Sequence, residues 1–150
     1  MTRKTKPTKQ PASPSEGLID ALVPASFVTM AALNKIGADN DLSLTLIRVL
    51  GILWDRRPRM AELADRLGLK KSTMTGLIDR AEQRGLVARA PNAEDDRAID
   101  VFLTRKGMAL VERVRAQGQQ ALAPLTERLN ASDQRLLADL LWKMLEHPKG

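Results

Sequence analysis

A cluster of basic and hydroxyl side chains lies between two apolar helical patterns. It consists of Lys70, Lys71, Ser72, Thr73 and Thr75, with Arg80 two turns later. Ammonium groups neutralise phosphates, and hydroxyls bond to phosphates or to base edges. A solvated helix start, in which Ser72 and Thr73 serve only as caps, explains the cluster equally well when it is taken alone. The elements around the cluster must decide between a DNA-binding helix and an ordinary solvated helix start.

A second polar segment, residues 91–97, contains Asp95, Asp96 and Arg97. The segments 86–90 and 99–103 on either side of it are short and rich in apolar residues, which predicts two β-strands joined as a hairpin with a long tip. Aspartate is also common in turns, where it bonds the local backbone, so Asp95 has a purely structural explanation as well.

The rest of the chain has helical periodicity. Ser13 and Ser43 are predicted N-caps of the first two helices, and Thr104 of the fifth. Gly68 and Gly85 are expected to end the third and fourth helices. A final helix is predicted to start near Asn130 or Ala131. We expect a kink or restart at Pro24 and weak points at Gly118 and Pro124, because these residues interrupt helices.

Composition limits the alternatives. The chain has 150 residues, 43% of them hydrophobic, which suits one globular domain. It has no cysteine and one histidine, His147, which we expect at the surface, so disulfides, thiol catalysis and His- or Cys-based metal sites are unsupported. No apolar run is expected to be long enough for a membrane span and no secretory signal is evident, so we expect a cytoplasmic protein. The net charge of +6 favours a polyanionic partner.

The order of the elements predicts the fold: a mainly α protein with a small β-hairpin wing, that is, a winged helix-turn-helix plus a helical dimerisation region. We expect a disordered basic arm over 1–12, a dimerisation helix over 13–40, a DNA-binding domain over 43–104 and dimerisation helices over 105–147. The turn at Gly68 would set the angle of the fourth helix, so that its start enters a major groove about 12 Å wide.

The chain resembles the MarR-type bacterial regulators. The resemblance rests on the blocks 62–64, 71–75, 85–87, 95–98 and 103–107, and it extends over roughly residues 18–145. It implies that Arg97 of the wing enters the minor groove and that Asp95 helps to hold the wing. It also implies that the fourth helix is the recognition helix, and that the first, fifth and sixth helices form the dimer.

Two residues depart from the family pattern. Gly76 stands within the recognition helix, where the family often has a long polar side chain, and it costs about 1 kcal/mol relative to alanine. Close backbone approach to DNA or a different operator sequence would each explain it. Arg59 replaces the small hydroxyl residue that often caps the third helix.

We therefore predict a sequence-specific DNA-binding transcriptional regulator, a homodimeric repressor on a pseudo-palindromic operator in double-stranded DNA. Its dimer surface would include the apolar face of the last helix: Leu136, Leu140, Leu141 and Met144. Packing of that face on the first helix is the alternative, and both can hold at once because the terminal helices would be shared between subunits. The resemblance suggests release by a small aromatic or apolar effector, with Phe27, Met30 and Trp54 as candidate contacts, although core burial explains these three more simply.

A constitutive winged-helix module without an effector is the alternative function. No phosphate loop, nucleophile elbow, metal set or catalytic triad appears in the sequence, so we expect neither an enzyme nor a cofactor.

Overall fold

The computed structural model describes residues 9–146. Residues 1–8 and 147–150 lie outside the described part, and with them most of the predicted basic arm and His147. The described residues form six helices and one two-stranded antiparallel sheet. The predicted class, mainly helical with a hairpin wing, is confirmed.

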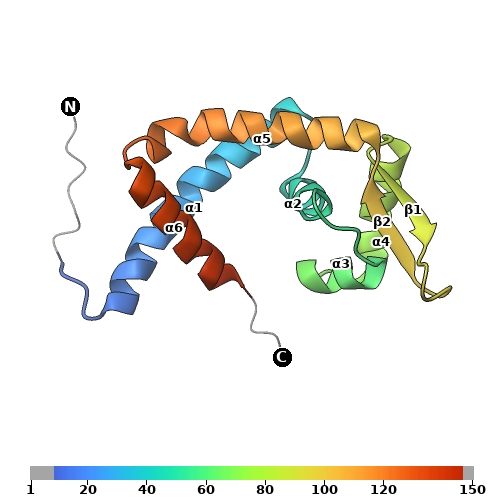
Figure 1. The fold of residues 1–150 in the computed structure, drawn as a ribbon, viewed down its shortest axis with the longest axis horizontal. Coiled ribbons are helices and arrows are strands. Elements are labelled where there is room, and N and C mark those ends of the chain that lie inside the picture. Colours follow the sequence, from blue (N-terminus) through green and yellow to red (C-terminus); the bar gives the residue numbers. More distant parts are fainter. Residues whose placement is uncertain (1–8, 147–150) are drawn as a thin grey trace.

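The helices fall into two groups (Figure 1). The long helices α1 (Pro14–Asp39) and α5 (Arg105–Thr126) pack on each other, and α6 (Ala131–Leu145) follows at the far end of α5. The compact group at the other end of α5 contains α2 (Leu44–Leu53), α3 (Met60–Leu67), α4 (Lys71–Gln83), β1 (Val87–Pro91) and β2 (Ile99–Leu103).

Side-chain caps start four of the helices. The side-chain oxygen of Ser13 accepts from the Glu16 N–H, and that of Ser43 accepts from the Leu46 N–H. Thr104 caps α5 and Asn130 caps α6 in the same way. These caps, and the left-handed Gly68 and Gly85 (φ 63° and 73°), match the sequence predictions. Each satisfies a backbone group that a helix end leaves unpaired.

The core lies in the compact group. Leu63, Met74, Ile78 and Val101 are fully buried there, and Val49, which the sequence pattern did not single out, joins them. The hairpin pairs Val87 with Leu103 and Pro91 with Ile99, so β1 begins one residue later than predicted.

Three predicted weak points do not break their helices. α1 continues through Pro24, and α5 continues through Gly118 and Pro124. A proline removes one backbone hydrogen bond, and the turns on either side keep theirs. Near Pro24, the Ser26 hydroxyl also donates to the Val23 carbonyl at 2.7 Å. The expected restart at Pro24 is therefore wrong.

Most apolar side chains of α1 and α6 are exposed in the single chain. Phe27 is 67% and Met30 46% exposed, so the expected core burial of these two is wrong. All residues of α6 are exposed, so packing within the same chain does not bury its apolar face. By length and composition alone, α1 is apolar enough to cross a membrane, with a mean hydropathy of 1.4, contrary to our expectation from the sequence.

Among the described glycines, Gly107 at the start of α5 packs most closely against the backbone of another segment. A Cβ on Gly107 would lie 1.9 Å from the carbonyl oxygen of Leu86. Thr104 reinforces this contact, because its N–H donates to Leu86 at 3.1 Å and its hydroxyl donates to the Gly85 carbonyl at 2.5 Å. A glycine is therefore required where α5 crosses the start of β1.

We predict that Gly107→Ala destabilises the protein by at least about 2 kcal/mol, because the clash is with backbone that no rotamer change relieves. The control is Gly51→Ala in α2, where no atom lies within 4 Å of the added Cβ. It should stabilise the fold by up to about 1 kcal/mol through helix propensity. Chemical denaturation of both variants measures the difference. Equal stability of Gly107→Ala and the parent would contradict the packing described.

Candidate nucleic-acid interface

The turn between α3 and α4 presents the start of α4 to solvent. The Leu69 N–H donates to the Ala64 carbonyl at 3.0 Å across the left-handed Gly68. Lys70 occupies the N-cap position of α4 without a side-chain cap bond. Ser72 and Thr73 are exposed and lie inside the helix, so the explanation that they serve only as caps does not hold. The first N–H groups of α4 therefore lack a side-chain acceptor.

A groove of about 410 Å³ lies between α3, α4 and the wing. It brings together residues that the sequence analysis took from two separate segments: Lys71 and Thr75 of α4, and Asp95 and Arg97 of the wing. Arg59, at the uncapped start of α3, lines it as well. Its full lining is Arg59, Met60, Ala61, Lys71, Thr75, Arg89, Asp95, Arg97, Ala98 and Ile99.

Gly76 and Arg80 do not line this groove. A Cβ on Gly76 would meet nothing nearer than the Arg80 guanidinium, at 3.6 Å. No contact within the described residues therefore demands a glycine at this position of α4.

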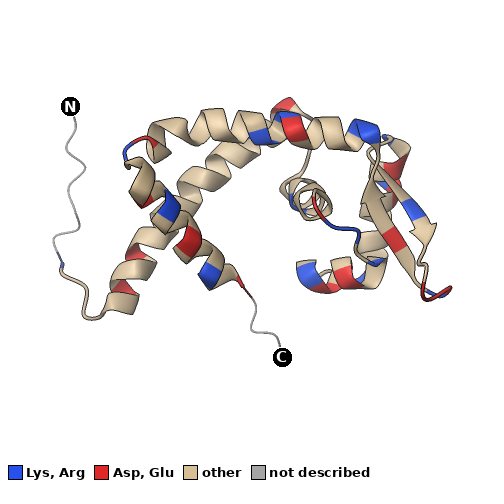
Figure 2. Cartoon of the chain, in the orientation of Figure 1, with Lys and Arg blue, Asp and Glu red and all other residues tan. Residues whose placement is uncertain are grey.

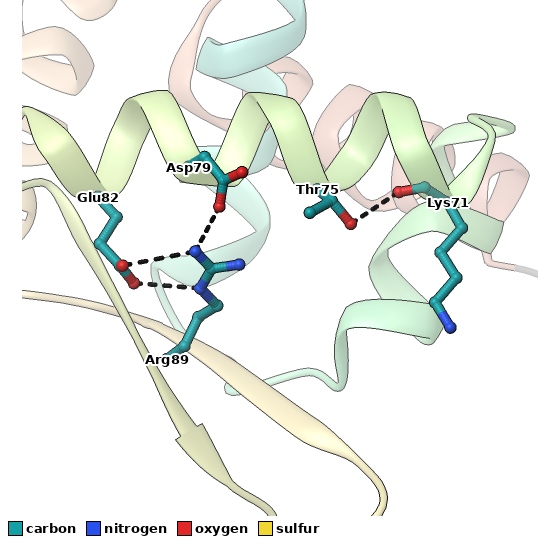
Figure 3. A network of polar contacts seen from close by, with 5 residues as sticks. All are labelled: Lys71, Thr75, Asp79, Glu82 and Arg89. Atoms are coloured by element: carbon teal, nitrogen blue, oxygen red, sulfur yellow. Dashed lines mark hydrogen bonds and ion pairs between the residues drawn. The ribbon is translucent and has the colours of Figure 1, made fainter.

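Arg89 ties the wing to α4 (Figure 3). From β1 it pairs with both Asp79 and Glu82 of α4; its Nε lies 3.2 Å from Glu82 Oε2. Hydrogen bonds to Glu82 and then to Asp79 raise the pKa of Arg89 above its ordinary value. In the same view the Thr75 hydroxyl donates to the Lys71 carbonyl at 2.9 Å. The Thr75 oxygen thus keeps lone pairs for a donor from outside.

Asn92 and Asp95 shape the wing tip. The Asn92 side-chain oxygen accepts from the N–H groups of Glu94 and Asp95, and Asp95 Oδ1 accepts from the Arg97 N–H at 3.0 Å. Asp95 therefore does bond the local backbone, as its turn chemistry predicts. The exposed Arg97 is held on the turn that these bonds define.

Asp100 anchors the end of β2 next to the wing tip, where it pairs with Ala90. It is buried to 8% exposure, accepts from Asn92 Nδ2 at 2.8 Å and lies 3.6 Å from Arg57 Nε. The Arg57 guanidinium in turn lies 4.0 Å from the centre of the Phe102 ring. Sequence reasoning missed this set. The available signal was a lone acid, Asp100, in a strand that is otherwise apolar.

Charge on this end of the molecule is mixed (Figure 2). Acidic residues gather at the wing tip (Figure 2), where Glu94, Asp95 and Asp96 directly precede Arg97 in the sequence. Bases lie along the connection from α2 to α3. The wing tip therefore carries a net negative charge, with Arg97 as the base among residues 91–98.

A small apolar cavity of about 180 Å³ lies between α1, α2 and α5. Its lining is Leu33, Leu42, Ile47, Leu50, Gly51, Val111, Val114, Arg115 and Gly118. Phe27, Met30 and Trp54 are not among these residues, although the Arg115 guanidinium stacks 5.1 Å from the Trp54 ring. Within residues 9–146, no group of three carboxylate or histidine side chains is placed to hold a metal ion.

Comparison with known proteins decides the family. A model described as "MarR family" matches residues 42–99, the winged part of the chain. The homoprotocatechuate degradative operon repressor of Escherichia coli is 29% identical over 128 residues, which cover 84% of this chain and 86% of that protein. The chain belongs to the MarR family.

Solved structures agree with this assignment. Wild-type MarR of Escherichia coli is 29% identical with a TM-score of 0.66, over 87% of this chain and 96% of that one. NadR, solved in complex with 4-hydroxyphenylacetate, shares the fold with a TM-score of 0.75 at 22% identity, over 95% of this chain and all of that one. This MarR-family chain is thus a transcriptional regulator of a DNA-binding, non-enzymatic family.

Proposed function

We propose that this regulator is a homodimeric, sequence-specific repressor that a small aromatic carboxylate releases from its operator. The observation that carries the proposal is the shared groove, in which Lys71 and Thr75 of α4 face Asp95 and Arg97 of the wing. The uncapped start of α4 enters the major groove, while Arg97 reaches the neighbouring minor groove.

Each residue of the interface has a distinct task. Lys70, Lys71 and the free N–H groups of α4 bind phosphates, and Ser72, Thr73, Thr75 and Arg80 face base edges or backbone. Asp95 holds the wing turn from which Arg97 extends. Gly76, which no internal contact requires, allows the DNA to approach the helix backbone closely.

The second subunit covers the apolar faces of α1 and α6. Leu18, Ile19 and Phe27 of α1, and Leu136, Leu140, Leu141 and Met144 of α6, are all 37% or more exposed in the single chain. Contiguous apolar surface of this kind marks an interaction site. A two-fold dimer would place recognition helices about 34–36 Å apart, one turn of a pseudo-palindromic operator. Such a dimer would act in the cytoplasm, and the apolar α1 would face a subunit and not a membrane.

The cavity between α1, α2 and α5 would hold the effector. Its wall is apolar, and Arg115 at its edge offers a guanidinium to a carboxylate. NadR binds an aromatic carboxylate, and the Escherichia coli relative is named for an operon that degrades one. A constitutive regulator without effector is the alternative.

The first prediction separates the wing from the recognition helix. Arg97→Ala should weaken binding to all duplexes and lower the salt slope by about one unit per subunit, because one phosphate-facing cation is lost. Thr75→Ala should cost about 1–3 kcal/mol on the preferred site and relax its selectivity. Asp95→Ala should be a milder form of Arg97→Ala. Affinities for a selected and a random duplex at several salt concentrations measure all three.

Arg105→Ala is the control for charge loss in this series, because Arg105 is exposed at the start of α5, outside the groove. If Arg97→Ala matched the parent on both duplexes across the salt range, the proposed role of the wing would be wrong.

The second prediction concerns assembly. Leu140→Asp should split the dimer and lower operator affinity at least tenfold, since it places a charge in the apolar interface without touching the groove. Arg135→Asp, on the polar face of α6, should leave the dimer intact. Sedimentation at micromolar concentration distinguishes the two, and a folded parent monomer under those conditions would remove the basis for the dimer.

The third prediction tests the effector. 4-Hydroxyphenylacetate should bind the parent and weaken its operator binding at least about fivefold, the scale of ordinary allosteric coupling. Arg115→Met should bind the carboxylate more weakly while keeping operator affinity. Operator binding that no aromatic carboxylate changes would favour the constitutive alternative.

A further inference from the structure

Arg84 holds the end of the recognition helix to a distant part of the chain. It is the C-cap of α4, and its guanidinium donates to the carbonyl of Asp41 at 2.7 Å and to that of Asn40 at 3.3 Å. Both carbonyls belong to the connection between α1 and α2, more than 40 positions earlier in the sequence.

Asn40 also forms side-chain hydrogen bonds with α5. Its Nδ2 donates to Gln117 Oε1 at 2.7 Å and to the Ile36 carbonyl at 2.8 Å, and Arg113 Nε donates to its Oδ1 at 3.4 Å. One asparagine therefore joins the end of α1, the middle of α5 and, through Arg84, the end of α4.

The backbone of this connection has little freedom. Asp41 has a φ of 56°, in the left-handed region that side chains other than glycine rarely adopt. The Leu42 N–H donates to the Gly37 carbonyl at 2.7 Å, and a Cβ on Gly37 would lie 2.5 Å from the Leu42 carbonyl oxygen. Displacement of Leu42 must therefore displace Asn40 and Asp41 as well.

Leu42 is also a wall of the apolar cavity. The cavity is lined from α5 by Val114 and Gly118, on either side of the Gln117 that holds Asn40. A ligand in this cavity would press on the two elements that the Asn40 contacts join.

We infer that Arg84 is a positioning residue that couples the cavity to the recognition helix. It makes this contact from the far end of α4, away from the DNA-facing start of that helix. With the cavity empty, Arg84 holds α4 at the angle that fits the operator; a ligand shifts Leu42 and the two carbonyls, and α4 turns with them. This inference rests on the proposed effector function, because it names how occupation of that cavity reaches the DNA.

The test is a binding cycle with 4-hydroxyphenylacetate as the probe and a duplex selected from a random pool as the DNA. In the parent, saturating probe should weaken DNA binding at least about fivefold. Arg84→Met should bind the probe within about twofold of the parent, yet the effect of the probe on DNA affinity should fall to less than twofold. An unchanged effect in Arg84→Met would overturn the inference.

Arg105→Met is the matched control, because it removes one exposed cation that makes no hydrogen bond or ion pair among residues 9–146. It should keep the full effect of the probe. Arg84→Lys, which keeps the charge but can reach fewer carbonyls, should give an intermediate effect.

If the probe does not bind the parent, that result counts against the proposed effector and not against the positioning role of Arg84. Hydrogen exchange then tests that role without the probe. DNA binding should then slow exchange of the Asn40, Asp41 and Leu42 amides in the parent but not in Arg84→Met. Equal exchange rates of these amides with and without DNA in the parent would overturn the inference.

Discussion

Where α5 crosses the start of β1, the Gly107 backbone packs directly on the carbonyl of Leu86, and three functional parts depend on this contact. Leu86 directly follows Gly85, the left-handed glycine after α4. Thr104, which closes the wing and caps α5, donates to the backbone of Gly85 and Leu86. Lys106 adds a bond from α5 to the Arg84 carbonyl at 2.9 Å. The end of α4, the base of the wing and the start of the long helix are thus fixed relative to one another.

From this junction the wing extends as a hairpin with two lateral supports. Arg89 holds β1 to α4, and Asp100 holds β2 to the connection before α3 through Arg57. Buried or half-buried charges of this kind are stabilising only when they are paired, and here each has its partner. The supports explain how a wing tip with more acids than bases can still present Arg97, since the backbone bonds of Asn92 and Asp95 set its direction.

Local chemistry made much of this fold predictable from the sequence. Caps at Ser13, Ser43 and Thr104 and left-handed glycines after α3 and α4 are signals that lie within a few residues of their effect. What the sequence did not predict depends on distant partners. The Asn92–Asp100–Arg57 set and the contacts of Arg84 with Asn40 join segments that only the folded chain brings together. The exposure of Phe27 was missed for a related reason, since an apolar stripe is the same whether its own chain or a second subunit covers it.

The central claim is that this MarR-family protein binds DNA as a two-fold dimer, with α4 in the major groove and the wing beside it. Selection of binding sites from a random duplex pool by the parent protein tests it most directly. We predict enrichment of pseudo-palindromes whose half-sites are centred about 10 base pairs or a multiple of that apart. Enrichment of unpaired single sites, or no enrichment above the starting pool, would contradict the claim.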